Sequence, residues 1–187
     1  MRPRMWPRRP VYFPRMWALP LVLLAGLFAW SVGWVGVWSH PIAGHALAVD
    51  GDTLRIGGQR VRLTGIDAPE LDQTCRDGSS NEWRCGEAAR TFLVALLKGR
   101  DATCARSGRD VYGRTLATCT IEGRDVGAQL VAAGWALSDI GYPREEADAR
   151  AAQLGIWSGS VVLPADWRRS HGVPADPFWE WIRSWFQ

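Results

Sequence analysis

Four acidic residues fall within a single stretch, residues 49–70, which reads VDGDTLRIGGQRVRLTGIDAPE. They are Asp50, Asp52, Asp67 and Glu70, and Arg62 is one of three arginines between them. Carboxylates that lie close together raise one another's pKa, so their convergence requires a positive partner. That partner is a bound cation, an arginine that also grips an anionic substrate, or both. Carboxylate and carbonyl oxygens without clustered His or Cys suit a hard cation such as Ca2+ or Mg2+ better than zinc. The stretch therefore predicts metal-assisted phosphoryl chemistry.

Short strands are expected to position these residues. Residues 45–49 and 53–56 have the composition of strands, Gly57-Gly58 is a hairpin signal, and residues 59–66 form a third expected strand. Strict alternation along that strand would place Arg62 and Asp67 on opposite faces. Both reach one site only if the strand bends, bulges or ends between them, and Gly65 is the expected place.

The remainder of the domain alternates helices with strands. Apolar residues at helical spacing predict a helix that begins at Cys85 and is capped by Gly99. Residues 102–105 and 115–121 are expected strands, Asp125 is expected to cap a short helix, and residues 143–154 form a third expected helix. Five short strands with interposed helices predict an α+β domain built on a small barrel.

The four cysteines, Cys75, Cys85, Cys104 and Cys119, are expected to form two disulfides, since an even count in an exported region favours bridges. Three pairings are possible. A Cys75–Cys85 bridge would close a polar loop, and Cys104 and Cys119 flank an expected hairpin turn symmetrically. Four free buried thiols are the alternative. A zinc site built from all four is disfavoured because no CxxC pair is present.

The N-terminal segment predicts a membrane anchor. Residues 1–16 form an Arg- and Pro-rich tail, expected to be disordered and cytoplasmic, and residues 17–38 form the expected transmembrane signal anchor. Its uncharged part, Ala18 to Trp38, would span about 30 Å as a helix, the thickness of a bilayer core. The upstream arginines favour a cytoplasmic N-terminus and a single pass through the inner membrane, with the domain periplasmic or extracellular. Secretion after signal cleavage near Ala46-Leu47-Ala48 is the alternative.

Charge outside this segment is nearly balanced, because the chain beyond residue 49 holds 17 basic and 19 acidic residues. A broad basic field for nucleic acid is therefore excluded, and local arginines must bind any phosphates. Residues 161–187 form a Trp-rich tail that either lies in a membrane interface or packs on the domain.

The motifs VDGDT, RLTGIDAPE, CGEAA, DVYGR and GIW occur in an order that resembles the staphylococcal nuclease (thermonuclease) family. The resemblance covers about residues 43–160. It implies that residues 39–160 form a five-stranded OB-fold barrel with three helices. The cysteine pattern is similar to that of exported bacterial members.

The resemblance also implies a Ca2+ site. Asp52, Asp67 and the backbone carbonyl of Ala68 match the family's Ca2+ ligands. Glu70 matches the glutamate that orients or deprotonates the attacking water. Asp50 is expected to support the ligands without touching the ion.

Arg62 and Arg114 match the two arginines that bind the scissile phosphate. A planar guanidinium donates two parallel hydrogen bonds to a phosphate and stays protonated. Tyr112 and Tyr142 are candidates for stacking on a base, although a tyrosine in a turn is as readily explained by packing.

The expected function is therefore Ca2+-dependent hydrolysis of DNA and RNA, mainly single-stranded, by a membrane-anchored endonuclease without an obligate protein partner. The resemblance implies 5′-O cleavage that leaves 3′-phosphate ends. One alternative is a non-catalytic OB-fold module of the cell envelope that binds nucleic acid or protein. Another is a structural envelope protein that uses the aromatic tail as its contact surface.

Overall fold

The structure is a computed structural model, and it describes residues 40–172. The expected tail at 1–16, the expected anchor at 17–38 and residues 173–187 lie outside this range. The chain divides into two compact units, Met1–Trp38 and Ser39–Gln187. The elements described below all belong to the second. No helix within residues 40–172 has both the length and the apolar character needed to cross a membrane.

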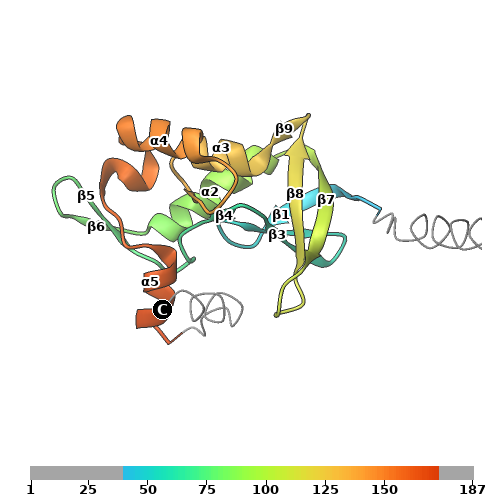
Figure 1. The fold of residues 1–187 in the computed structure, drawn as a ribbon, viewed down its shortest axis with the longest axis horizontal. Helices are drawn as coiled ribbons and strands as arrows, with labels where there is room; N and C mark the ends of the chain where they lie inside the picture. The colour runs from blue at the N-terminus through green and yellow to red at the C-terminus, as the bar shows by residue number, and fades with distance from the viewer. Residues whose placement is uncertain (1–39, 173–187) are drawn as a thin grey trace, which may run out of the picture. The chain divides into compact units, whose positions relative to one another are not determined.

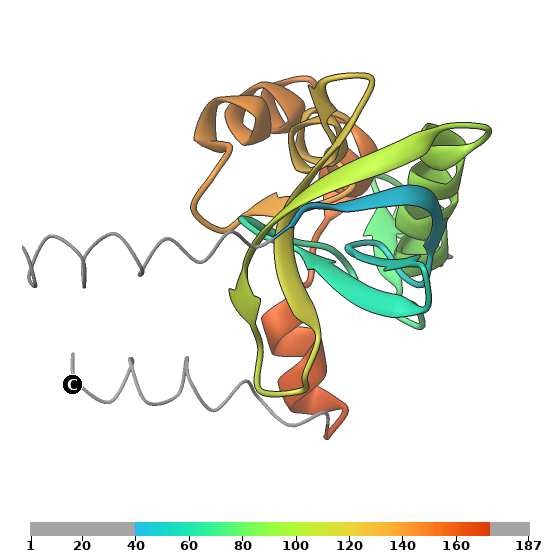
Figure 2. The same ribbon diagram turned by 90° about the vertical axis from the view of Figure 1, so that its right-hand side faces the viewer.

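A closed barrel of five strands forms the centre of the second unit (Figures 1 and 2). The strands are β1 (Ile42–Ala48), β2 (Thr53–Ile56), β3 (Gln59–Leu63), β7 (Asp101–Arg109) and β8 (Thr115–Ile121). They run in the order β3-β2-β1-β7-β8, and a parallel pairing of β3 with β8 closes the barrel. The expected five-stranded OB-fold barrel is confirmed.

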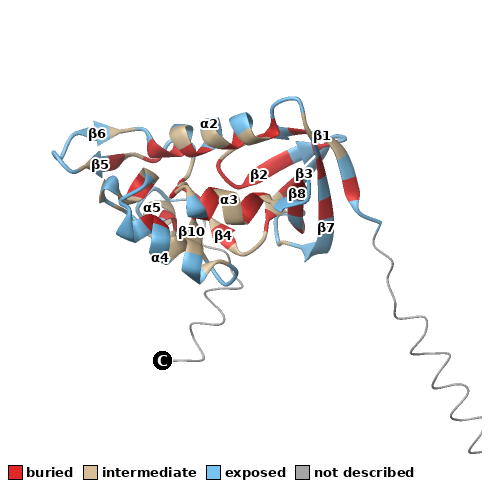
Figure 3. Ribbon diagram, turned by 90° about the horizontal axis from the view of Figure 1, so that it is seen from above, coloured by how far each residue is buried: buried red, intermediate tan, exposed pale blue. Residues whose placement is uncertain are grey.

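Three helices of the domain are those that the sequence predicts. They are α2 (Cys85–Leu97), α3 (Val126–Ala132) and α4 (Pro143–Ala151). The Asp125 side chain caps α3, because its Oδ1 accepts a hydrogen bond of 3.0 Å from the Ala128 amide. One face of α2, with Leu93 and Leu97, is buried in the core of the barrel (Figure 3). Burial of each such leucine contributes roughly 2 kcal/mol.

Several short elements were not predicted from the sequence. A hairpin of β5 (Cys75–Asp77) and β6 (Glu82–Trp83) pairs with β11 (Gly159–Ser160), and β4 (Ile66–Asp67) pairs with β10 (Leu137–Ser138). The strand β9 (Arg124–Asp125) extends the main sheet beyond β8. A 3-10 turn, η2 (Gly155–Ser158), and the helix α5 (Pro164–Ser170) follow α4. The short strands and the 3-10 turn carry no hydrophobic period, and α5 (PADWRRS) has a single large apolar side chain, Trp167.

Both expected disulfides are present, and no cysteine of the domain is free. Cys104 and Cys119 lie directly opposite each other on β7 and β8, with their Cα atoms 4.0 Å apart. The Cys75–Cys85 bridge joins β5 to the first residue of α2. The pairing suggested by the hairpin symmetry is confirmed, and the alternatives of free thiols and a four-cysteine zinc site are excluded.

Candidate active site

The loop between β1 and β2 holds Asp52 beside Ala68, the residue that follows Asp67. Asp50 Oδ1 accepts hydrogen bonds from the amides of Asp52, at 3.1 Å, and Thr53, at 2.7 Å, and so fixes the turn. Glycine is required at position 51, since an added Cβ would lie 2.7 Å from the Cβ of Ala68. This close approach lets the buried Asp52 Oδ2 accept the Ala68 amide at 3.2 Å. Asp50 thus supports the site through the backbone.

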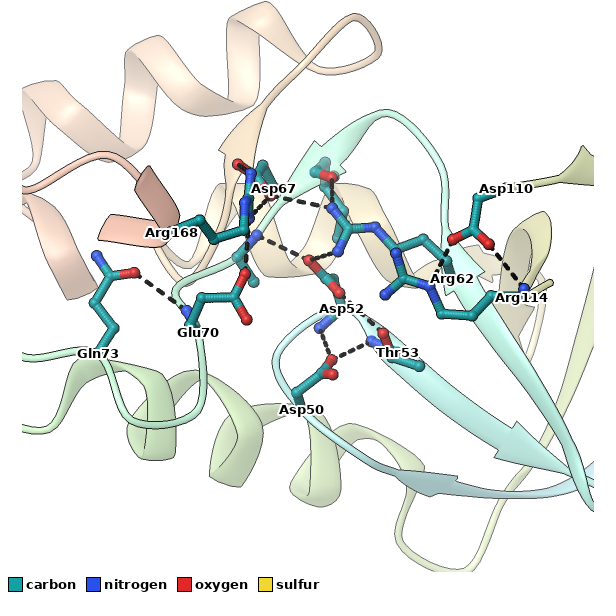
Figure 4. Close-up of polar contacts among 12 residues, drawn as sticks. Asp50, Asp52, Thr53, Arg62, Asp67, Glu70, Gln73, Asp110, Arg114 and Arg168 are labelled. Atoms are coloured by element: carbon teal, nitrogen blue, oxygen red, sulfur yellow. Dashed lines mark hydrogen bonds and ion pairs between the residues drawn. The ribbon is translucent and has the colours of Figure 1, made fainter. Parts of the chain in front are cut away.

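Arg62 joins two of the expected metal ligands. Its Nη1 lies 2.7 Å from Asp52 Oδ2, and its Nη2 lies 3.0 Å from Asp67 Oδ1. The strand ends between Arg62 and Asp67, because β3 stops at Leu63 and Gly65 adopts a φ of +78° before β4 begins. The break expected at Gly65 is therefore confirmed, and it turns both side chains into one site (Figure 4).

Buried charge dominates the electrostatics around Arg62. Burial raises the pKa of Asp52 to about 7 against the lowering effect of Arg62, and the charges of Asp50 and Asp67 raise it further. Burial of Arg62 would lower its pKa, but Asp52 and Asp67 outweigh this and raise it. The ionised carboxylate of Asp52 is thus only partly compensated, and additional positive charge near it would be stabilising.

Glu70 lies at the other end of the network. Its amide donates to Gln73 Oε1 at 3.1 Å, and its side chain pairs with Arg168 of α5. Arg168 Nη1 lies 2.8 Å from Glu70 Oε1 and 3.1 Å from Asp67 Oδ1, while Nη2 lies 3.1 Å from Asp67 Oδ2. These hydrogen bonds and charges outweigh the effect of burial, so the pKa of Arg168 is raised. Asp67 is therefore shared by two guanidinium groups.

Arg114 approaches from the hairpin between β7 and β8. Its Nε donates to Asp110 Oδ2 at 2.6 Å, and its amide donates to Asp110 Oδ1 at 2.8 Å. Burial would raise the pKa of Asp110, but the hydrogen bonds from Arg114 lower it. Figure 4 shows the Arg114 side chain extending from the hairpin toward Arg62. Asp110 thus aims the second expected phosphate-binding arginine at the first.

The two tyrosines occupy different environments. Tyr112 is 54% exposed at the hairpin tip, where the Arg114 guanidinium lies 5.6 Å from its ring centroid. Tyr142 is half-buried, and its hydroxyl donates to Asp125 Oδ2 at 2.9 Å. Burial and this hydrogen bond raise the pKa of Tyr142. Tyr142 thus ties the start of α4 to the cap of α3, and stacking on a base stays a prediction for both tyrosines.

Four of the predicted residues are joined directly, whereas Arg114, Tyr112 and Tyr142 make their contacts outside this group. Asp52, Arg62, Asp67 and Glu70 belong to one connected network, with Ala68 beside Asp52. Within residues 40–172, no three His, Cys, Asp or Glu side chains are grouped closely enough to hold a metal ion. Guanidinium groups stand among the carboxylates instead. The candidate metal ligands are all oxygen atoms, and the carboxylates of the network outnumber its guanidinium groups. Ligands of this type suit a hard cation such as Ca2+.

Arg168 is the site residue that sequence reasoning missed. It lies 101 positions after Asp67 and 98 after Glu70, in a tail whose aromatic residues dominate its pattern. A proline at the first turn of α5 is a helix-start signal. Nothing in the spacing indicates that this helix reaches the carboxylates.

The amino-acid sequence is similar to those of known proteins. The model of the family described as staphylococcal nuclease homologue matches residues 60–159. Succinoglycan biosynthesis protein ExoI of Rhizobium meliloti is 38% identical over 126 residues, which cover 64% of this chain and 66% of that protein. A Haemophilus influenzae protein named an uncharacterized endonuclease is 29% identical over 136 residues, 66% of this chain and 71% of its own. An Escherichia coli O157:H7 protein of the same name is 29% identical over 157 residues, 78% of this chain and 92% of its own.

Proposed function

Because the chain belongs to the family of staphylococcal nuclease homologues, we propose that it is a Ca2+-dependent endonuclease that hydrolyses DNA and RNA, mainly single-stranded, by 5′-O cleavage. The relatives named as endonucleases support the coarser conclusion that it is a nuclease. One observation carries the proposal. Arg62 bridges Asp52 and Asp67, and Arg168 joins Asp67 to Glu70, so the expected metal-ligand carboxylates and the expected general base converge on one guanidinium-lined site.

The residues of this site suit phosphodiester hydrolysis. A phosphodiester anion repels hydroxide, and its transition state gathers further charge on the equatorial oxygens. Arg62 and Arg114 would bind those oxygens, and Glu70 would orient or deprotonate the attacking water. Asp52, Asp67 and the Ala68 carbonyl would hold Ca2+, which when bound supplies positive charge against the phosphate. The hydrogen bonds from Asp50 and Asp110 keep Asp52 and Arg114 in position.

The test is hydrolysis of single-stranded DNA by the purified chain with Ca2+ or with EDTA. We expect activity with Ca2+, none with EDTA, and products that carry 3′-phosphates. Glu70→Gln and Arg62→Ala should each lower the rate by about 10²-fold or more, the usual loss for a general base or an electrostatic stabiliser. Far-ultraviolet circular dichroism would verify that both variants keep the fold.

A matched control uses the chain's own exposed charges. Glu122 is an exposed residue of the turn between β8 and β9 whose side chain pairs with Arg100 and Arg124, so Glu122→Gln makes the same chemical change at the far end of β8 from the site. It should keep wild-type activity. Full activity in Glu70→Gln would refute the assigned mechanism, and tight oligonucleotide binding without turnover under any divalent cation would favour a non-catalytic module.

We also propose that the domain lies outside the cytoplasm and is attached to the membrane through residues 17–38. The two disulfides support this, because such bridges persist in oxidising compartments. Protease added to intact spheroplasts should degrade the domain of the full-length protein, and the membrane pellet should retain the protein before digestion. Protection of the domain in spheroplasts, with degradation after lysis, would refute this topology.

A further inference from the structure

The last described helix inserts an arginine into the proposed metal site. Arg168 binds both oxygens of Asp67 and one oxygen of Glu70 (Figure 4). Its side chain is only 24% exposed, against 21% for Asp67 and 32% for Glu70. The family model ends at residue 159, so Arg168 belongs to a segment beyond the family match.

The segment that carries Arg168 is fixed at its base. The strand β11 pairs with β5. The side chain of Gln73, a fully buried residue, donates a hydrogen bond from Nε2 to the Val162 carbonyl at 2.8 Å. The same Gln73 side chain accepts the Glu70 amide. The base of the segment and the backbone of Glu70 are therefore held by one residue, and this brings α5 over the site.

The helix itself buries little of its surface. Of the residues of α5, only Pro164 is buried. Arg169, next to Arg168, is exposed and pairs with Asp166 of the same helix. Few buried contacts other than those of Arg168 hold α5 down, and such elements open at low free-energy cost.

A cation bound by Asp67 would need oxygens that the arginines already occupy. Asp67 Oδ1 accepts from Arg62 and Arg168, and Asp67 Oδ2 accepts from Arg168. Arg62 lies on a barrel strand and is tied to the buried Asp52 as well, whereas Arg168 lies on the lightly packed helix. The group displaced at lower cost is therefore Arg168.

We propose that Arg168 is a further residue of the site, which competes with the divalent cation for Asp67 and Glu70 and so sets the cation concentration at which the site fills. This inference rests on the proposed metal-dependent function. Without the cation, Arg168 neutralises both carboxylates and α5 covers the site. Binding of the cation releases Arg168, and the free energy of breaking its ion pairs is subtracted from the binding free energy.

The experiment compares Ca2+ binding by three full-length proteins: the wild type, Arg168→Gln and Arg169→Gln. Ca2+ is titrated by isothermal calorimetry after removal of metal with EDTA. Arg168→Gln should bind Ca2+ about tenfold more tightly or better, the effect of losing a competing charge-assisted contact. Arg169→Gln removes the same charge from the same helix, but its partner is Asp166, so it should bind as the wild type does. Unchanged or weaker binding by Arg168→Gln would overturn the proposal.

A charge-conserving variant separates competition from general electrostatics. Lys in place of Arg168 keeps the charge but cannot bind both Asp67 oxygens and Glu70 in the same planar arrangement. Arg168→Lys should therefore bind Ca2+ with an affinity between those of the wild type and Arg168→Gln. An affinity equal to that of the wild type would show that charge alone acts, and would overturn the specific contact.

Hydrolysis assays distinguish failure of this inference from failure of the proposed function. Arg168→Gln should reach half its maximal rate at about tenfold less Ca2+ than the wild type, by the same loss of competition. Loss of activity with unchanged Ca2+ affinity would instead show that Arg168 binds the substrate. That result would overturn this inference and leave the proposed function standing. Tighter Ca2+ binding by Arg168→Gln in a chain that never cleaves DNA would support the competition and refute the proposed function.

Discussion

Gly86 links the first turn of α2 to the backbone of Glu70, and its replacement by alanine gives a direct test of how the site is positioned. A Cβ at Gly86 would lie 2.7 Å from the carbonyl carbon of Glu70 and 3.0 Å from that of Leu71, and closer still to the Glu70 oxygen. Ordinary van der Waals contact begins near 3.4 Å. The obstacle is backbone and not a flexible side chain, so either the helix or the Glu70 segment must move.

The size of the effect follows from this overlap. Overpacking of this kind costs about 3 kcal/mol, the upper end of the usual range, because no rotamer change relieves it. The backbone amide of Gly86 also donates to the backbone carbonyl of Gln73, and the Gln73 side chain accepts a hydrogen bond from the Glu70 amide. A shift of Glu70 by about 1 Å would lower the rate of hydrolysis by about 10²-fold.

Urea denaturation and single-stranded DNA hydrolysis measure the two consequences of Gly86→Ala. Gly78→Ala is the matched control, since its added Cβ would meet only the Ser158 carbonyl oxygen, at 3.4 Å, and its φ is not positive. The control should keep both stability and activity. A Gly86→Ala variant with wild-type stability and wild-type activity would show that the α2 contact does not position Glu70.

Two further perturbations test the buried charge and the barrel. Burial raises the pKa of Asp52 from 3.8 to about 7, so the native carboxyl binds a proton more readily than the unfolded one. The ionised Asp52 carboxylate therefore lowers the free energy of unfolding. This loss is absent below about pH 4 and complete above about pH 7. In EDTA at pH 8, Asp52→Asn should raise the free energy of unfolding, measured in urea, by up to about 4 kcal/mol, and the gain should vanish at pH 4; a less stable variant at pH 8 contradicts this. Replacing Cys104 and Cys119 together by alanine should lower the free energy of unfolding by about 3 kcal/mol, since the cross-link spans 15 positions. An equal thermal midpoint with and without the bridge would argue against that contribution.

Local patterns were sufficient to predict much of the fold. The apolar spacing of residues 85–97 and the Asp125 cap predicted two helices that the structure forms. Each signal is local, because a helical period or a cap is complete within one or two turns of chain. The strand pair of β2 and β3 followed similarly from the Gly57-Gly58 turn. The hairpin of β5 and β6 was missed because strands of two or three residues contain no usable alternation.

The sequence by itself determined which side chains the site offers for chemistry. The carboxylates and Arg62 fall within 21 positions, and the break at Gly65 could be inferred from the alternation of side chains in a strand. Only the tertiary structure decided that Arg168 lies on Asp67 and Glu70, and that Arg62 bridges Asp52 and Asp67 directly. A contact between segments about a hundred residues apart depends on how the barrel, the β5 hairpin and β11 place their ends. No short-range pattern records that placement, because it results from packing of the whole domain.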